Sequence, residues 1–160
     1  MGAPKFYRWN RSFWRDSKNR RLVEHGPTVF MVACYLLTSP RGNMSGIFEC
    51  PLSAISKALM LHPEEVYDSI QLLTGIDFLQ YEEDSEYVWI IGAADHELGR
   101  NPSLQQIIGL LNLLERLEID ELAPFVENLR SSILANPIYQ EKLKLQEDIS
   151  HAKQKFHAIK

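Results

Sequence analysis

The sequence predicts a mainly helical protein with a small antiparallel β-sheet, followed by a C-terminal helical segment. Three observations predict this class. Apolar residues recur at helical spacing along most of the chain, the period changes to two from residue 77, and glycines and prolines separate the periodic segments. The chain has 160 residues, of which 45% are hydrophobic and 24% charged, so it can bury a core of its own.

The first core helix is expected between the Gly-Pro pair at 26–27 and the Ser-Pro pair at 39–40. Thr28 is expected to cap this helix, and the apolar run Val29–Leu37 predicts that it is buried. This run is far shorter than the roughly 20 residues that span a bilayer, so no membrane association is expected. A short strand is predicted at Gly46–Glu49, and Pro51, which cannot donate to a β-ladder, ends it.

Two further helices are expected close together. The first begins near Ser53 and carries apolar residues at helical spacing through Ile55 and Leu59. The pattern breaks at residues 62–63, where Pro63 fits the first position of the second helix. Two glutamates follow this proline, where the helix dipole favours acids, and the second helix is expected to end at Gly75.

A β-hairpin is predicted after these helices. Phe78–Glu82 and Tyr87–Ile91 are rich in aromatic and β-branched residues, and an acidic tip at 83–86 separates them. The order of elements is then helix, short strand, helix, tight turn, helix and hairpin. This order is typical of a winged helix-turn-helix, in which the hairpin completes a small three-stranded sheet.

Residues 1–95 are therefore interpreted as a winged-helix domain with a basic, aromatic N-terminal arm, and residues 96–160 as a segment of three helices. The stretch 93–102 is interpreted as a linker. Ser103 is expected to cap the first of the three helices, Pro124 lies in the first turn of the second, and the third begins after the Asn-Pro pair at 136–137. This last helix carries an a/d seam, which either packs on its own chain or pairs with a second copy. The seam residues are Leu145, Ile149, Ala152, Phe156 and Ile159.

Charge is segregated along the chain. Residues 1–47 carry eight basic residues against two acids, a net charge of +6, whereas residues 48–99 carry one basic residue against eleven acids, a net charge of −10. Residues 100–160 carry eight residues of each sign. The sequence therefore predicts a positive end and a negative body, which bears on the choice of partners.

Short runs in the first 92 residues resemble a known family. The residues RSFWRD at 11–16, YLLTSP at 35–40 and GIF at 46–48 resemble the N-terminal domain of phage replisome organisers and of the related DnaD-type primosome proteins. The likeness continues through Pro51–Leu59, His62–Leu73 and the hairpin to Ile91. It implies a winged-helix module that works in phage or prophage replication initiation by DNA contact, self-association or loading of other replication proteins. The Tyr-x-x-x-Ile-x-x-Trp element of the DnaD C-terminal domain is not found, so the resemblance does not extend to that domain.

The sequence gives little support to an enzyme, and no cofactor or metal is expected. It lacks the phosphate-binding patterns G-x-x-x-x-G-K-[ST] and G-x-G-x-x-G and the nucleophile pattern G-x-S-x-G. Asp95, His96 and Glu97 are interpreted as a solvated linker rather than a metal site. Cys34 and Cys50 do not form a C-x-x-C pair and are expected to be reduced thiols in a cytoplasmic protein.

The predicted recognition helix and the wing are acidic, which disfavours the usual docking of a winged helix on DNA. Affinity for duplex DNA comes largely from Lys and Arg that neutralise phosphates, and this face would repel them. The acidic residues are instead expected to bind a partner protein, either a replication protein or another one. They are Glu64, Glu65, Asp68, Glu83, Asp84 and Glu86.

The N-terminal arm is the better DNA-binding candidate, because its basic residues can reach phosphates and the aromatic residues between them can stack on bases. The alternative is that the rings are core residues and the arginines stay in water or pair with the acidic wing of a neighbouring subunit. The leading hypothesis is thus a DNA-binding replication protein, and the alternative is a non-enzymatic interaction or oligomerisation scaffold. The candidate DNA-binding residues, called the basic segment below, are Arg8, Arg11, Arg15, Lys18, Arg20 and Arg21.

Overall fold

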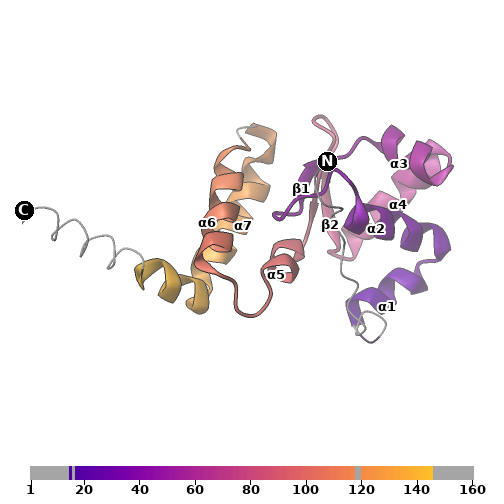
Figure 1. Ribbon diagram of the computed structural model, residues 1–160. Coiled ribbons are helices and arrows are strands. Elements are labelled where there is room, and N and C mark those ends of the chain that lie inside the picture. The colour runs from indigo at the N-terminus through magenta and orange to yellow at the C-terminus, as the bar shows by residue number, and fades with distance from the viewer. Residues whose placement is uncertain (1–14, 16, 118–119, 146–160) are drawn as a thin grey trace, which may run out of the picture. The chain divides into compact units, whose positions relative to one another are not determined.

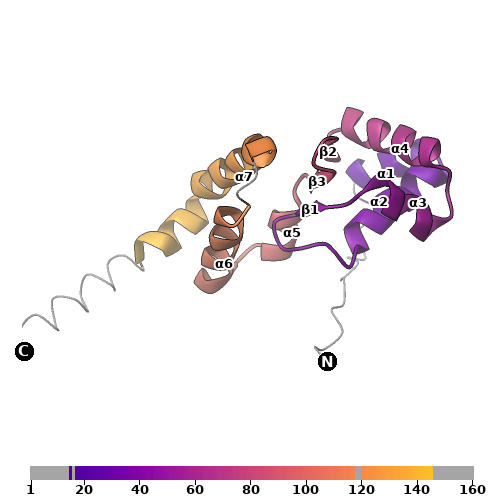
Figure 2. The same ribbon diagram turned by 90° about the horizontal axis from the view of Figure 1, so that it is seen from above.

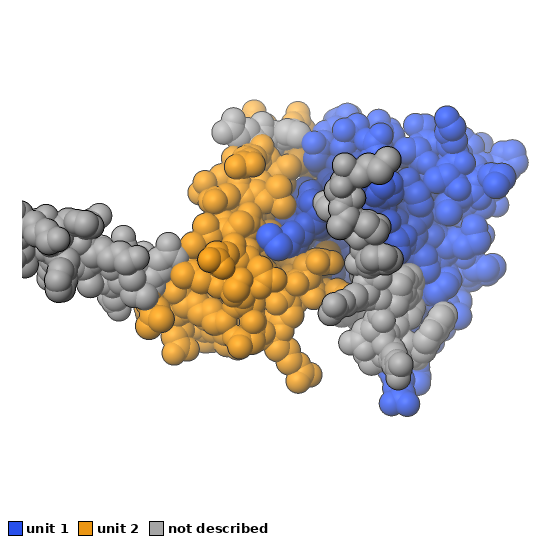
Figure 3. Space-filling model, viewed as in Figure 1, with its two compact units in different colours: residues 1–92 blue, residues 93–160 orange. Residues whose placement is uncertain are grey.

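The computed structural model describes residues 15, 17–117 and 120–145 of the chain (Figure 1). It divides into two compact units, residues 1–92 and 93–160 (Figure 3). The described part is mainly helical and contains one three-stranded antiparallel sheet, as the sequence predicts. No described helix is long and apolar enough to cross a membrane.

The first unit begins with two helices, α1 (Ser17–Glu24) and α2 (Pro27–Thr38). α1 contacts α2 and buries Leu22 completely. The expectation that Thr28 caps α2 is wrong: Gly26 is the N-cap, with φ of 100°, and the helix already begins at the following proline. The fixed φ of proline suits the first helical position, and glycine reaches a positive φ without the steric cost that a side chain brings. α2 is buried along one side only, because Met31, within the apolar run that was expected to be buried, is exposed.

Two helices joined by a three-residue turn complete the helical part of this unit. α3 (Leu52–Leu59) begins one residue before the expected start, and α4 (Pro63–Gly75) has the predicted bounds. Between them, Met60 ends α3 in the left-handed conformation, with φ of 55°. α4 packs mainly against α2 and buries Val66, Ile70 and Leu73, which recur at helical spacing.

The sheet consists of β1 (Ile47–Glu49), β2 (Leu79–Glu82) and β3 (Tyr87–Ile90). The strand order is β1-β3-β2, so the hairpin formed by β2 and β3 adds its second strand to β1. In the register, Trp89 lies opposite Ile47 on one side and Gln80 on the other. The predicted strand and hairpin are confirmed to within one residue at each end. Within this unit, both views show the strands on one side and the helices α1–α4 on the other (Figures 1 and 2).

The second unit contains the helices α5 (Ala93–Leu98), α6 (Leu104–Glu115) and α7 (Ala123–Ala135), and a short 3-10 helix, η2 (Asp120–Leu122). Residues 137–145 are helical as well. The interpretation of 93–102 as a linker is wrong for its first six residues, because α5 buries Ala94 and Leu98. The predicted cap of α6 is confirmed: the Ser103 hydroxyl accepts the Gln106 N–H at 3.2 Å, and the Gln106 side chain accepts the Ser103 N–H.

Apolar faces of α6 and α7 form the core of this unit. The fully or nearly fully buried residues of α6 recur every three to four positions, and those of α7 recur every four. Of the predicted a/d seam in the last helix, only Leu145 is described, and the other four seam residues lie outside the described residues. The buried residues are Ile107, Leu110, Leu114, Phe125, Leu129 and Ile133.

Candidate nucleic-acid interface

The basic segment continues into α1. Arg8 and Arg11 lie outside the described residues, Arg15 is exposed, and Lys18 belongs to the first turn of α1. From Ser17 onward the basic segment is helical. Burial of Leu22 against α2 accounts for this helix, because most of the stability of a short helix comes from tertiary contacts.

The arginines of α1 face solvent. Arg20 and Arg21 are exposed, and no described carboxylate forms an ion pair with them or with Arg15. Three guanidinium groups in this part of the chain are therefore exposed and carry no ion pair with a described carboxylate. Each presents planar donors that match a phosphate, and the helix holds two of them on adjacent positions.

The acidic residues of α4 divide into two kinds. Glu64 and Asp68 are exposed on the helix surface. Glu65 is also exposed, but its side chain accepts the backbone N–H of His62 at 2.9 Å and so closes the first turn of α4. This structural role was missed at the sequence level, although a glutamate three positions after a helix cap is a known signal for it.

The hairpin tip is held in a defined loop. The Glu82 carboxylate accepts both the backbone N–H and the hydroxyl of Ser85, each at 2.6 Å. These two hydrogen bonds lower the pKa of Glu82. Glu83 and Asp84 are exposed at the tip, whereas Glu86 is half-buried with φ of 56°. Two of the three predicted acidic tip residues are thus exposed to solvent.

A contact that sequence reasoning missed joins α4 to the hairpin. The Tyr67 hydroxyl donates to Oε1 of Glu83 at 3.3 Å. The negative charge of Glu83 raises the pKa of Tyr67, and Asp68 adds to this effect. An exposed tyrosine of α4 therefore contacts Glu83 of the hairpin and also lies near Asp68. The two acidic segments meet at this point.

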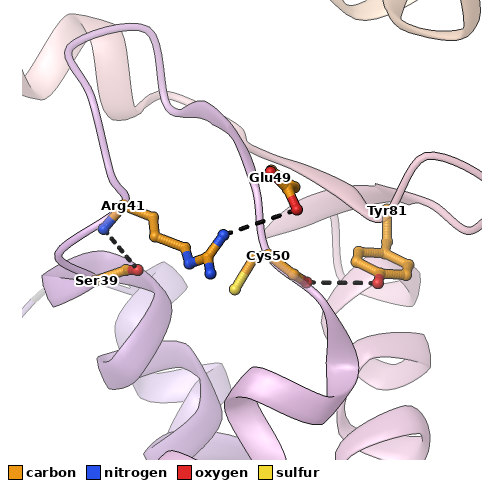
Figure 4. A network of polar contacts seen from close by, with 5 residues as sticks. All are labelled: Ser39, Arg41, Glu49, Cys50 and Tyr81. Carbon is orange, nitrogen blue, oxygen red and sulfur yellow. Dashed lines mark hydrogen bonds and ion pairs between the residues drawn. The ribbon is translucent and has the colours of Figure 1, made fainter.

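A second polar network lies around the start of the sheet (Figure 4). Arg41 forms an ion pair with Glu49 at 3.7 Å, and its backbone N–H donates to the Ser39 hydroxyl at 3.3 Å. The Tyr81 hydroxyl donates to the backbone oxygen of Cys50 at 3.4 Å. These contacts tie the loop after α2, the end of β1 and β2 to one another, so the network has a structural role.

The buried groups of this network are held in their neutral forms. Burial raises the pKa of the Cys50 thiol to about 11, although the charge of Arg41 acts against this shift. Burial also raises the pKa of Tyr81, and the nearby Glu86 adds to the effect. A thiol with a raised pKa is a poor nucleophile at neutral pH. Cys50 is therefore a core residue rather than a reactive one.

Asp95, His96 and Glu97 lie on α5 rather than on an extended linker. Successive helical residues point about 100° apart, so the three side chains diverge around the axis. Within the described ranges, no three His, Cys, Asp or Glu side chains are grouped in a way that could hold a metal ion.

Comparison with known proteins found no matching family model, no matching curated protein and no matching solved structure. The likeness to replisome organisers thus depends on the sequence runs quoted above. Any functional conclusion depends on the charge and exposure of this chain's own residues.

Proposed function

We propose that this chain is a DNA-binding winged-helix protein of replication initiation, and that it contacts DNA through the basic segment rather than through α4. The exposure of Arg15, Arg20 and Arg21, without an ion pair to any described carboxylate, is the observation that carries this proposal. The role in replication rests on the family resemblance of residues 6–92.

The order and pairing of the elements in the first unit support a winged helix. α3 and α4 are joined by a turn of three residues, and the hairpin of β2 and β3 pairs with the short strand β1. A helix-turn-helix has such a short connection, and the hairpin takes the place of the wing. On this interpretation α4 is the second helix of the motif.

The charge of α4 and the hairpin disfavours docking by this motif. Glu64, Asp68, Glu83 and Asp84 are exposed, and they would repel the phosphates that flank the major groove. The basic segment instead offers exposed cations within a part of the chain whose net charge is +6. Phosphate contacts of this kind confer affinity without sequence preference.

The test is fluorescence anisotropy of labelled single- and double-stranded DNA at several salt concentrations, with the full chain. Each phosphate contact contributes about 0.7 to 0.9 to the slope of log affinity against log salt concentration. The variant Arg20→Gln/Arg21→Gln should therefore bind more weakly, with a slope reduced by about 1.4 to 1.8. An unchanged slope in this variant contradicts the proposal.

A matched control is available in the second unit. Arg100 and Arg116 are also exposed arginines, so Arg100→Gln/Arg116→Gln removes the same charge outside the basic segment. This control should keep the wild-type slope. A slope that falls equally in both variants would indicate a general charge effect rather than a DNA contact by α1.

The second candidate function is a protein-interaction scaffold that uses the acidic surface. The contact between Tyr67 and Glu83 favours it, because it places an exposed aromatic residue among carboxylates, and Leu72 is exposed on the same helix. Aromatic residues are enriched at protein interfaces, and carboxylates suit a basic partner. If the wild-type chain binds no DNA at low salt, this second function is favoured.

A further inference from the structure

The outer side of β1 is one edge of the sheet. In the strand order β1-β3-β2, β1 has a neighbouring strand on one side only. Its backbone hydrogen bonds to the hairpin include one accepted by the Gly46 oxygen at 2.9 Å and one donated by the Cys50 N–H at 2.8 Å. Because neighbours along a strand direct their backbone groups to opposite sides, Ile47 and Glu49 direct theirs away from β3. Groups at such an edge are a template for a strand of another chain.

At Ile47, two side chains of the preceding loop already occupy this edge. The Ile47 N–H donates to the Ser45 hydroxyl at 3.0 Å, and the Asn43 side-chain amide donates to the Ile47 backbone oxygen at 2.6 Å. One acceptor and one donor thus take the two positions that a neighbouring strand would take. Ile47 and Ser45 are both fully buried. The loop therefore covers the edge at this residue.

Residues 43–45, called the strap below, are held in place by further hydrogen bonds. The side-chain oxygen of Asn43 accepts both the N–H and the hydroxyl of Ser45, at 2.9 and 2.6 Å. The Gly46 N–H donates to the backbone oxygen of Asn43 at 3.1 Å. Only one orientation of the Asn43 amide satisfies these contacts, because the exchange of its oxygen and nitrogen would place two acceptors against each other at Ile47.

Glu49, the other residue that directs its backbone away from β3, is protected in a different way. Its exposed side chain forms the ion pair with Arg41 (Figure 4), and Pro51, which has no N–H, follows two positions later. Charged side chains and prolines are features of strand edges that do not pair. We propose that the strap closes the sheet at β1 and so prevents the β1 strands of two copies of the chain from pairing edge to edge.

The test replaces both strap side chains in the full chain, as Asn43→Ala/Ser45→Ala, and compares the mass of this variant with that of the wild type by sedimentation velocity. The variant leaves the N–H and the carbonyl oxygen of Ile47 without their partners, as at an open edge. It should therefore self-associate at least about 10-fold more tightly than the wild type. Circular dichroism checks that the variant is folded.

Ser69→Ala is the matched control. Ser69 is also buried, and its hydroxyl donates to the Glu65 backbone oxygen at 2.7 Å, on α4 rather than beside β1. This control loses a buried hydrogen bond as well, but it should have the mass of the wild type. The proposal is overturned if the folded double variant keeps the wild-type mass, or if Ser69→Ala self-associates as strongly as the double variant.

Amide hydrogen exchange keeps the proposal testable if the double variant does not fold. In the wild type, exchange at Ile47 should be slowed at least about 10-fold more than at Glu49, each relative to the unfolded chain, because the strap binds the Ile47 N–H. Ser45→Ala alone should remove most of this difference. Equal protection of the two amides in the wild type, or an unchanged difference in Ser45→Ala, would overturn the proposal. These measurements involve no DNA, so their outcome is independent of the proposed function.

Discussion

Burial of Cys50 next to β1 couples one side chain to the stability of the fold. The ordinary pKa of this thiol is 9.0, and burial of the sulfur raises the pKa to about 11 in the folded protein. The folded state therefore holds the proton more tightly than the unfolded state. The resulting stabilisation is fully present below pH 9 and is lost as the pH rises towards 11.

Alkaline pH should thus destabilise the protein partly through Cys50. Between pH 8 and 10.5 we expect this thiol to account for a loss of about 2 kcal/mol in the free energy of unfolding. Urea unfolding of the wild type and of Cys50→Ala, followed by circular dichroism at both pH values, measures the difference. The alanine variant should be less stable at pH 8 but lose less stability on going to pH 10.5. Parallel losses in the two proteins would show that Cys50 does not titrate as described.

Met60 has a left-handed backbone conformation that is unfavourable for its residue type. Its side chain is 93% exposed, so it contributes little to the core, and its φ of 55° is costly for a residue with a Cβ. Glycine adopts this conformation freely and is the usual residue at the end of a helix. The backbone conformation at position 60 therefore favours glycine over methionine.

Met60→Gly should raise the free energy of unfolding by about 0.5 to 1 kcal/mol. The control is Lys57→Gly, an exposed position within α3, where the same change should lower stability by about 1 kcal/mol. Thermal or urea denaturation of both variants gives the comparison. A loss of stability in Met60→Gly would mean that the exposed side chain or the turn has a role that the single chain does not reveal.

At the scale of elements, the beginning of α4 shows that an acidic residue can serve the fold rather than a partner. Glu65 accepts the His62 N–H, whereas the adjacent Glu64 makes no such capping contact. The two residues share the same charge and nearly the same distance from the helix dipole. Substituting each of them in turn therefore separates the contribution of the capping hydrogen bond to stability from the contribution of charge.

Glu65→Ala should destabilise the protein by about 1 kcal/mol, because it leaves one amide of the helix start without its partner. Glu64→Ala should cost less than about half of that, because it loses only a favourable interaction with the helix dipole. Denaturant unfolding of the two variants at neutral pH makes the comparison. Equal losses would assign the effect to charge alone.

The elements could be predicted where their signals are local. Pro63 and the following glutamates mark the start of α4, and the alternating residues on both sides of the acidic tip mark the hairpin. α5 could not be predicted, because six residues give too few repeats for a helical period to appear. The contact of Tyr67 with Glu83 joins residues sixteen positions apart, and no local pattern encodes it.

At the scale of the molecule, the net charge changes along the chain. Residues 1–47 carry a net charge of +6 and residues 48–99 a net charge of −10, whereas residues 100–160 carry equal numbers of both signs. The exposed arginines of α1 and the exposed carboxylates of α4 and the hairpin carry this segregation to the surface. A polyanion should therefore bind to the arginines of α1 and be repelled by the carboxylates of α4 and the hairpin.

This preference can be measured residue by residue, by following the backbone amide chemical shifts of the full chain as a short DNA is added at low salt. We predict that the largest changes fall on Arg15 and on residues 17–24 of α1, and that they disappear as salt is raised. Residues 63–75 and the hairpin tip at 83–86 should change little. If the largest changes fell on α4 and the hairpin, with α1 unaffected, DNA binding through the basic segment would be contradicted.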